Sequence, residues 1–228
     1  MPALRRRAGE PPFTMSLKPI ERLAVAALLL VAASACSPET PMNENPAFPE
    51  DAPRVVVETN LGSFVIGLYE EQAPVTVANF LSYVDAQHFD GTVFHRVMPG
   101  FMVQGGGFVR SNEQFVRNEV DPPIVLESDT GLKNYRGAVS MARTGQPDSA
   151  SDQFFVNLSH SQFLDRLGDV ELGYAVFGQV IEGMDVIDAI AAVETHVPDP
   201  GSVVGAPQFS EPTVPVEDVV ILSLRRQR

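Results

Sequence analysis

Short β-rich segments separated by glycine and proline turns restrict the folds open to this chain. They cover residues 55–58, 63–68, 92–97, 101–104, 137–142, 153–157, 174–180 and 216–224. Asn60, Leu61 and Gly62 between the first two segments predict a hairpin. Only two stretches show a helical period. The pattern predicts a mainly β fold in which an antiparallel barrel is capped by two helices.

Apolar residues three and four positions apart mark the two predicted helices. The first begins at Pro74, a residue that suits a first helical turn. Its buried stripe is predicted to be Val77, Phe80, Leu81 and Val84. The second helix covers residues 186–193, with Ile187 and Ile190 facing inward. The long loops 109–123, 144–152 and 158–173 are predicted to carry function.

The first 35 residues predict an export signal rather than part of the fold. Five basic residues precede or flank the start of an apolar run of 13 residues, 23–35. A membrane-spanning helix needs roughly 20 such residues. The basic lead, the short apolar run and the small residues Ala33, Ser34 and Ala35 are typical of a secretory signal peptide. Met15 is an alternative start to Met1.

Cys36, the one cysteine of the chain, follows directly, so a disulfide within the chain is excluded. Small residues before a lone cysteine resemble the lipobox of bacterial lipoproteins, whose cysteine is acylated. Ala33 stands where that motif usually has leucine, so a soluble exported protein is the alternative. We expect a lipoprotein on the periplasmic face of a bacterial membrane. Ser37 is not the aspartate of inner-membrane retention, which favours the outer membrane.

The remaining chain divides into a proline-rich linker, residues 36–53, and one domain, residues 54–228. The whole chain carries a net charge of −13. Removing residues 1–35 takes away five basic and two acidic residues and leaves a net charge of −16. This charge argues against nucleic acid as a partner and against an anionic membrane surface. We therefore expect membrane contact only through a lipid anchor.

Residues 94–106, FHRVMPGFMVQGG, place Arg96 among residues that favour burial. A guanidinium keeps its proton in proteins, and its five donors lie in a planar fork. In an apolar depression such a fork is a strong hydrogen-bond donor to a neutral amide. His95 would face the opposite side of a strand, so we interpret it as structural.

The polar residues outside this run do not indicate metal, phosphate or nucleophilic chemistry. His88, His160 and His196 lack the spacing of metal ligands. The glycines at 105–107 lack the Lys-Ser/Thr ending of a phosphate loop. Ser140 and Ser151 lack a Gly-x-Ser-x-Gly setting. We expect no metal and no cofactor.

Five motifs occur in the order and spacing of one known family. They are residues 94–106, then GAVSMA at 137–142, QFF at 153–155, FLD at 163–165 and YAVFG at 174–178. On these motifs residues 55–224 resemble the cyclophilins, which are peptidyl-prolyl cis–trans isomerases, and in particular their bacterial, periplasmic-type branch. The resemblance implies a closed eight-stranded antiparallel β-barrel capped by two α-helices. We expect a cofactor-free monomer.

The resemblance also implies roles for individual residues. Arg96 matches the catalytic arginine of the family, and Gln104 would hold Arg96 or the substrate carbonyl. Gln104 and Gln153 match polar groups that bind the substrate backbone, and Ala142 matches a small residue that lets the peptide lie close. The walls of the proline pocket would be Phe101, Met102, Phe155 and Leu164.

Three substrate-binding positions depart from the commonest pattern of the family. Arg143 replaces an asparagine that binds substrate through its backbone, so we expect the side-chain change to be tolerated. Phe163 replaces a tryptophan at the pocket rim, which implies weaker cyclosporin binding. Tyr174 replaces a histidine, and its ring can still line the pocket.

These matches imply an isomerase that accelerates X-Pro rotation in exported, partly folded proteins, with proline-containing polypeptides as partners. One alternative is a catalytically weak peptide-binding module or chaperone of the cell envelope that keeps the groove. Another is an assembly or scaffold role in the envelope. The sequence does not identify the client proteins or the preferred residue before proline.

Overall fold

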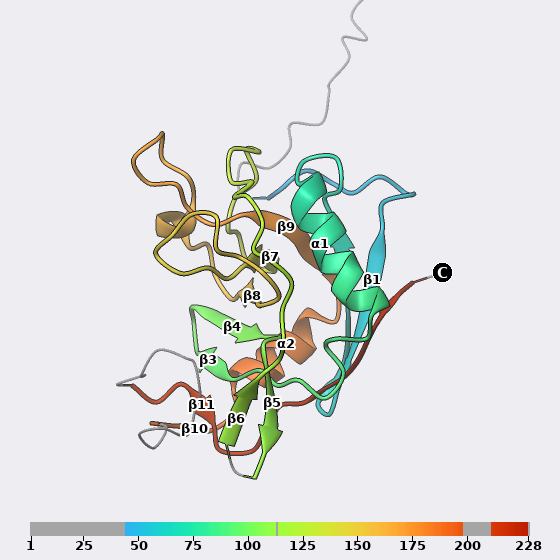
Figure 1. Ribbon diagram of the computed structural model, residues 1–228, viewed down its shortest axis with the longest axis vertical. Coiled ribbons are helices and arrows are strands. Elements are labelled where there is room, and N and C mark those ends of the chain that lie inside the picture. Colours follow the sequence, from blue (N-terminus) through green and yellow to red (C-terminus); the bar gives the residue numbers. More distant parts are fainter. Residues whose placement is uncertain (1–43, 113, 198–210, 228) are drawn as a thin grey trace, which may run out of the picture. The chain divides into compact units, whose positions relative to one another are not determined.

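The computed structural model describes residues 44–112, 114–197 and 211–227 (Figure 1). The predicted signal peptide, residues 1–35, and Cys36 lie outside the described residues. The predicted linker is described from Glu44 onward, and all described residues fall in one structural unit. The division into signal, linker and domain stays a prediction.

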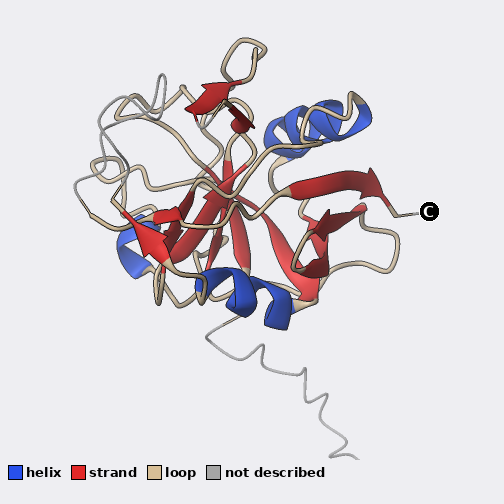
Figure 2. Cartoon of the chain, turned by 90° about the horizontal axis from the view of Figure 1, so that it is seen from below, coloured by secondary structure: helices blue, strands red, loops and turns tan. Residues whose placement is uncertain are grey.

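Eight strands form the main sheet, in the order β12-β1-β2-β9-β7-β8-β4-β3, with antiparallel pairing throughout. Their bounds are β1 (Arg54–Thr59), β2 (Gly62–Leu68), β3 (Arg96–Met98), β4 (Met102–Gly105), β7 (Ala138–Met141), β8 (Phe154–Asn157), β9 (Val176–Glu182) and β12 (Ile221–Arg226). In Figure 2 the strands occupy the middle of the domain and the helices lie around them. The predicted mainly β architecture with two α-helices is confirmed.

The sheet curls, but the predicted closed barrel is wrong, because the edge strands β3 and β12 do not pair with each other. Strand β3 has three residues, of which only Arg96 and Val97 belong to the predicted segment 92–97. On its outer side the N–H of Val97 donates to the carbonyl of Thr213 at 2.7 Å, next to β11 (Val214–Pro215). The segment before β3 does reach the start of β12: the N–H of Phe94 donates to the carbonyl of Val219 at 2.9 Å, and the N–H of Ile221 donates to the carbonyl of Thr92 at 2.7 Å.

The two predicted helices are confirmed. In α1 (Pro74–Asp85) all four residues of the predicted stripe are buried, none more than 4% exposed. The ring of Phe80 lies 5.0 Å from that of Phe177 on β9, so this stripe packs into the core beside the sheet. Helix α2 (Met184–Ala191) begins and ends two residues earlier than predicted, and Ile187 and Ile190 are fully buried. No helix among the described residues has both the length and the apolar character to cross a bilayer.

Residues 109–123, predicted as a loop, contain a hairpin. It consists of β5 (Phe108–Ser111) and β6 (Gln114–Arg117), which form a separate two-stranded sheet. Phe108 and Phe115 are buried, and the guanidinium of Arg110 lies 4.6 Å from the centre of the Phe115 ring. A second small sheet, missed by the sequence analysis, pairs β10 (Thr195–His196) with β11.

Candidate active site

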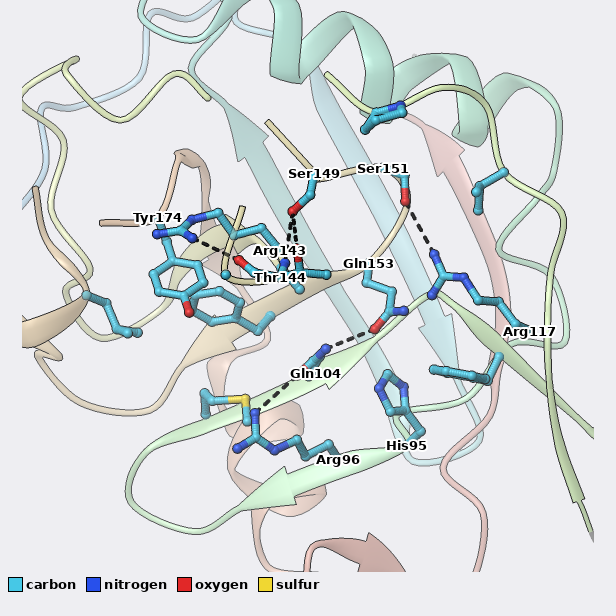
Figure 3. A pocket seen from close by; sticks show the side chains of 18 of the residues that line it. His95, Arg96, Gln104, Arg117, Arg143, Thr144, Ser149, Ser151, Gln153 and Tyr174 are labelled. Atoms are coloured by element: carbon cyan, nitrogen blue, oxygen red, sulfur yellow. Dashed lines mark hydrogen bonds between the residues drawn. The ribbon is translucent and has the colours of Figure 1, made fainter. Parts of the chain in front are cut away.

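A pocket of about 750 Å³ opens beside β3, β4 and β8 and is completed by loops (Figure 3). Eleven of the predicted site residues belong to the described chain, and ten of them line this pocket. These ten are Arg96, Phe101, Met102, Gln104, Ala142, Arg143, Gln153, Phe155, Leu164 and Tyr174. Residues up to 78 positions apart in the sequence are thus brought to one place, although the role of each stays a prediction.

The eleventh residue, Phe163, lies outside the pocket lining and is 70% exposed. It belongs to a short 3-10 helix, Gln162–Leu164, whose last residue does line the pocket. The centres of the Phe163 and Phe101 rings are 5.3 Å apart. Phe163 therefore stands beside the pocket wall rather than in it.

Three polar side chains form a hydrogen-bonded row along the pocket. Strand pairing places Arg96 on β3 opposite Gln104 on β4. Arg96 Nη1 donates to Gln104 Oε1 at 3.4 Å, and Gln104 Nε2 donates to Gln153 Oε1 at 2.9 Å. Burial lowers the pKa of the half-buried Arg96 from its ordinary value. A guanidinium still keeps its proton, so the pocket carries a fixed cation.

An apolar floor lies next to this row. Met102, Phe155 and Leu164 form one buried cluster, with exposures of 2%, 5% and 8%. The Phe155 ring meets that of Tyr174 edge to face, with centres 5.6 Å apart. Phe155 on β8 pairs with Gln104 on β4, so the sheet register itself sets the apolar floor beside the polar row. A small apolar ring with an attached amide suits such a site.

Arg143 fixes one wall of the pocket with its side chain. Its guanidinium lies 4.6 Å from the centre of the Tyr174 ring. Nε and Nη2 both donate to the carbonyl of Gly173, at 3.0 and 2.8 Å, and Nη1 donates to the carbonyl of Thr144 at 2.9 Å. Gly173 has a φ of +64°, and an added Cβ would lie 2.5 Å from the backbone nitrogen of Arg166. The side chain of Arg143 thus holds a turn that accepts only glycine without strain.

The individual residues at the other end of the pocket were not predicted from the sequence. It is lined by loop residues and the hairpin, including Phe108, Arg117, Val120, Asp121, Pro123, Thr144, Gly145, Ser149 and Ser151. Arg117 Nη2 donates to Asp152 Oδ1 at 2.9 Å, and the Asp152 side chain is fully buried. The length of the loops was the available signal. The pairing of Arg117 with Asp152 could not be predicted from the sequence, because 35 positions separate the two residues.

His95 also lines this end of the pocket, so its predicted orientation away from the site is wrong. It precedes β3, where strand alternation does not apply. Burial lowers the pKa of His95 to about 3, and its ring packs against Phe108 with centres 4.6 Å apart. His95 is therefore neutral at physiological pH and forms part of the pocket wall.

The described residues contain no cluster of three or more His, Cys, Asp or Glu side chains arranged to bind a metal ion. The pocket lining itself provides three guanidinium groups, amide side chains and an apolar floor. That set can bind an apolar ring and donate hydrogen bonds to a neutral amide.

The family model "Cyclophilin type peptidyl-prolyl cis-trans isomerase/CLD" matches residues 54–225. The chain belongs to this family. The match begins at the first residue of β1 and ends one residue before the end of β12.

Named bacterial relatives agree with this assignment. Peptidyl-prolyl cis-trans isomerase A of Dickeya dadantii is 49% identical over 142 residues, which cover 62% of this chain and 73% of that protein. Peptidyl-prolyl cis-trans isomerase B of Escherichia coli is 42% identical over 172 residues, covering 75% of this chain and 97% of that protein. The chain is thus a cyclophilin with peptidyl-prolyl cis–trans isomerase activity.

Solved structures support the fold. A crystal structure of a Cryptosporidium parvum cyclophilin type peptidyl-prolyl cis-trans isomerase covers 78% of this chain and 98% of its own, with a TM-score of 0.59 and 22% identity. A second crystal structure of that protein, in the presence of the dipeptide Ala-Pro, has a TM-score of 0.58 and 22% identity, with 77% of this chain and 99% of that chain covered. The curled sheet with two helices is the cyclophilin fold.

Proposed function

We propose that this cyclophilin accelerates rotation about X-Pro bonds by hydrogen bonding from Arg96 to the prolyl nitrogen. The observation that carries the proposal is the position of a half-buried guanidinium beside an apolar floor in one pocket. Gln104 accepts a hydrogen bond from Arg96 and so orients the guanidinium, and Gln153 holds Gln104 in turn. Both amides line the pocket in which we propose that the peptide binds.

The chemistry follows from amide resonance. Rotation about a peptide bond has a barrier of roughly 18–20 kcal/mol, because the nitrogen lone pair is delocalised into the carbonyl. In the twisted state this lone pair returns to the nitrogen, which becomes pyramidal and basic. A donor aimed at that nitrogen binds the twisted state more tightly than either planar isomer, and this difference lowers the barrier. The step breaks no covalent bond.

The apolar floor of Met102, Phe155 and Leu164 is the proposed seat of the proline ring. Burying the ring there excludes water and strengthens the hydrogen bonds of Arg96. The Cryptosporidium structure with Ala-Pro supports proline-containing peptides as ligands. Ala142 leaves room for the peptide, and the backbone of Arg143 is the proposed partner of the residue before proline.

We further propose that the protein acts as an exported monomer. One chain supplies every residue that lines the described pocket, so a second copy is not needed to complete it. The predicted signal peptide and Cys36 support a lipoprotein on the periplasmic side, with the outer membrane preferred over the inner. Its substrates would be X-Pro segments of exported proteins whose folding waits on proline isomerisation, a process of roughly 10–100 s without a catalyst.

The test is an isomerisation assay on a short X-Pro peptide with the Arg96→Ala variant. Loss of a donor that acts in the transition state should lower kcat/KM by about 100-fold. The thermal midpoint should change little, because Arg96 is half-buried at an edge strand. Arg136→Ala is a matched control, since Arg136 pairs with Asp188 outside the pocket and should keep full activity.

The same assay separates catalysis from the alternative of a peptide-binding module. A wild-type protein no faster than Arg96→Ala would favour the binding module. Equal losses of activity and of thermal stability in Arg96→Ala would make Arg96 a structural residue and contradict the proposal.

A further inference from the structure

The outer face of the sheet carries an apolar patch that the isomerase pocket does not use. On β7 and β9, Val139 and Phe177 face the main core, so Ala138 and Val176 face outward. Ala138 and Val176 form a separate buried cluster with Tyr69 and Leu132, all 6% exposed or less. We call these four residues the outer patch. Something must cover them, because solvent is excluded there.

Phe48 covers the outer patch. Its ring stacks on that of Tyr69, with centres 4.2 Å apart and planes inclined by 24°. It also lies over Gly67 on β2, where an added Cβ would be 3.2 Å from the ring carbons. Glycine at position 67 lets the ring rest directly on the backbone of the sheet. A residue of the predicted linker thus packs as part of the domain.

Hydrogen bonds hold the chain just before Phe48. Asn45 Nδ2 donates to the carbonyl of Lys133 at 2.9 Å, and the N–H of Lys133 donates to Asn45 Oδ1 at 2.8 Å. The hydroxyl of Tyr69 donates to the carbonyl of Pro46 at 3.0 Å. The Asn45 amide therefore pairs with both backbone groups of one residue, as a neighbouring strand would.

The connection from this segment to β1 is also fixed. The N–H of Ala52 donates to the carbonyl of Pro49 at 3.1 Å, which closes a turn. The N–H of Leu68 donates to the carbonyl of Pro53 at 2.9 Å. The carbonyls of Pro46 and Pro53, before and after Phe48 in the chain, thus both accept hydrogen bonds from the domain.

We propose that the outer patch is a binding site for the chain's own segment 45–48, Asn-Pro-Ala-Phe, which docks there and makes the folded unit begin at Asn45. Phe48 supplies the apolar contact, and the hydrogen bonds between Asn45 and Lys133 fix the position of the segment along the domain. The site is distinct from the isomerase pocket, because no residue of the segment or of the outer patch lines that pocket.

Docking limits how far the domain can lie from Cys36. An extended chain spans at most about 3.3–3.6 Å per residue. The nine steps from Cys36 to Asn45 reach about 30 Å, whereas the 18 steps to Arg54 would reach about 60 Å. This consequence rests on the proposed lipid anchor at Cys36. The docking itself does not, and the experiment below tests the docking alone.

The chain has no tryptophan, so a single tryptophan reports on its own surroundings. In the full chain, Phe48→Trp should emit at shorter wavelength and be quenched by acrylamide severalfold less than Ala47→Trp, because residue 47 is exposed. Isomerase activity of both variants should equal that of the wild type. Equal quenching of the two tryptophans would overturn the proposal.

Two further substitutions in the Phe48→Trp background test the site itself. Gly67→Val places a side chain where the ring lies and should release the tryptophan, raising its quenching to that of Ala47→Trp. Asn45→Ala removes the pairing with Lys133 and should raise quenching in part. Glu50→Ala, an exposed change in the same segment, is the control and should leave quenching unchanged. An indole at position 48 that stays protected in Gly67→Val would refute the assigned site while leaving the isomerase assignment untouched.

Discussion

The side chain of Arg143 shows how one residue can shape the pocket without touching the reacting bond. Its cation lies over the Tyr174 ring, and its three nitrogens donate to backbone carbonyls of Gly173 and Thr144. Tyr174 in turn packs edge to face on Phe155 in the apolar floor. The expectation that arginine is tolerated in place of asparagine at position 143 considered only the backbone, and these contacts give the arginine side chain a structural role of its own.

We therefore predict that Arg143→Ala raises KM and leaves kcat nearly unchanged. A cation–π contact at a partly exposed site stabilises by about 1 kcal/mol, which corresponds to about a fivefold loss in kcat/KM. Arg143→Lys keeps the charge but loses the planar fork, so it should recover only part of the loss. A fall in kcat with constant KM would instead place Arg143 in the transition state.

At the scale of elements, an ion pair joins the end of β12 to the segment between α1 and β3. Arg225 Nη1 and Nη2 donate to the two carboxylate oxygens of Asp90, at 2.8 and 2.6 Å. The hydrogen bonds from Arg225 lower the pKa of Asp90 below its ordinary value. Because β12 is an edge strand of an open sheet, this pair helps to fix an edge that barrel closure does not hold.

This shift predicts a pH-dependent stability. A carboxyl whose pKa is lower in the folded state contributes stability above its unfolded pKa of about 3.9, and that contribution is lost as pH falls through the folded pKa. Asp90→Asn should lower the free energy of unfolding by less than about 1 kcal/mol at pH 7, because both partners are partly exposed. The difference from the wild type should vanish in chemical denaturation at about pH 2. Arg225→Gln should give the same pH profile, and a constant difference across pH would contradict the ion pair as its cause.

Elements set by local patterns were predictable, whereas those set by distant pairing were not. Helix α1 follows from four apolar residues at helical spacing, and the motifs at 94–106, 153–155 and 163–165 together predicted the polar row and the apolar floor. The edge at β3 depends on the hydrogen bond from the N–H of Val97 to the carbonyl of Thr213, two residues that lie more than a hundred positions apart in the sequence. Strands β5 and β6 have only four residues each, too few for an alternation of apolar and polar residues to predict a strand. Arg117 was missed because its partners at the pocket, Ser151 and the buried Asp152, are more than thirty positions away in the sequence.

At the scale of the whole molecule, the charge of the chain determines how it can meet a membrane. Residues 36–228 carry a net charge of −16, which an anionic lipid surface repels. An amphipathic or basic surface is therefore a poor means of attachment, and we propose a covalent lipid at Cys36 as the attachment instead. The two modes differ in their response to salt, because screening acts on charge and leaves the burial of acyl chains intact.

We accordingly predict that the wild-type protein stays in the membrane fraction after a wash in about 1 M salt, where the Debye length is about 3 Å. Cys36→Ser should move the protein to the soluble fraction, since it removes the thiol that would be acylated and leaves the net charge unchanged. Ser37→Ala, which keeps that thiol, is the matched control and should remain with the membrane. The isomerase activity of the released Cys36→Ser protein should equal that of the wild type, because the pocket is built from residues 95–174. An unchanged membrane fraction in Cys36→Ser would exclude acylation of Cys36 as the anchor, and release of the wild type by salt would identify an electrostatic attachment instead.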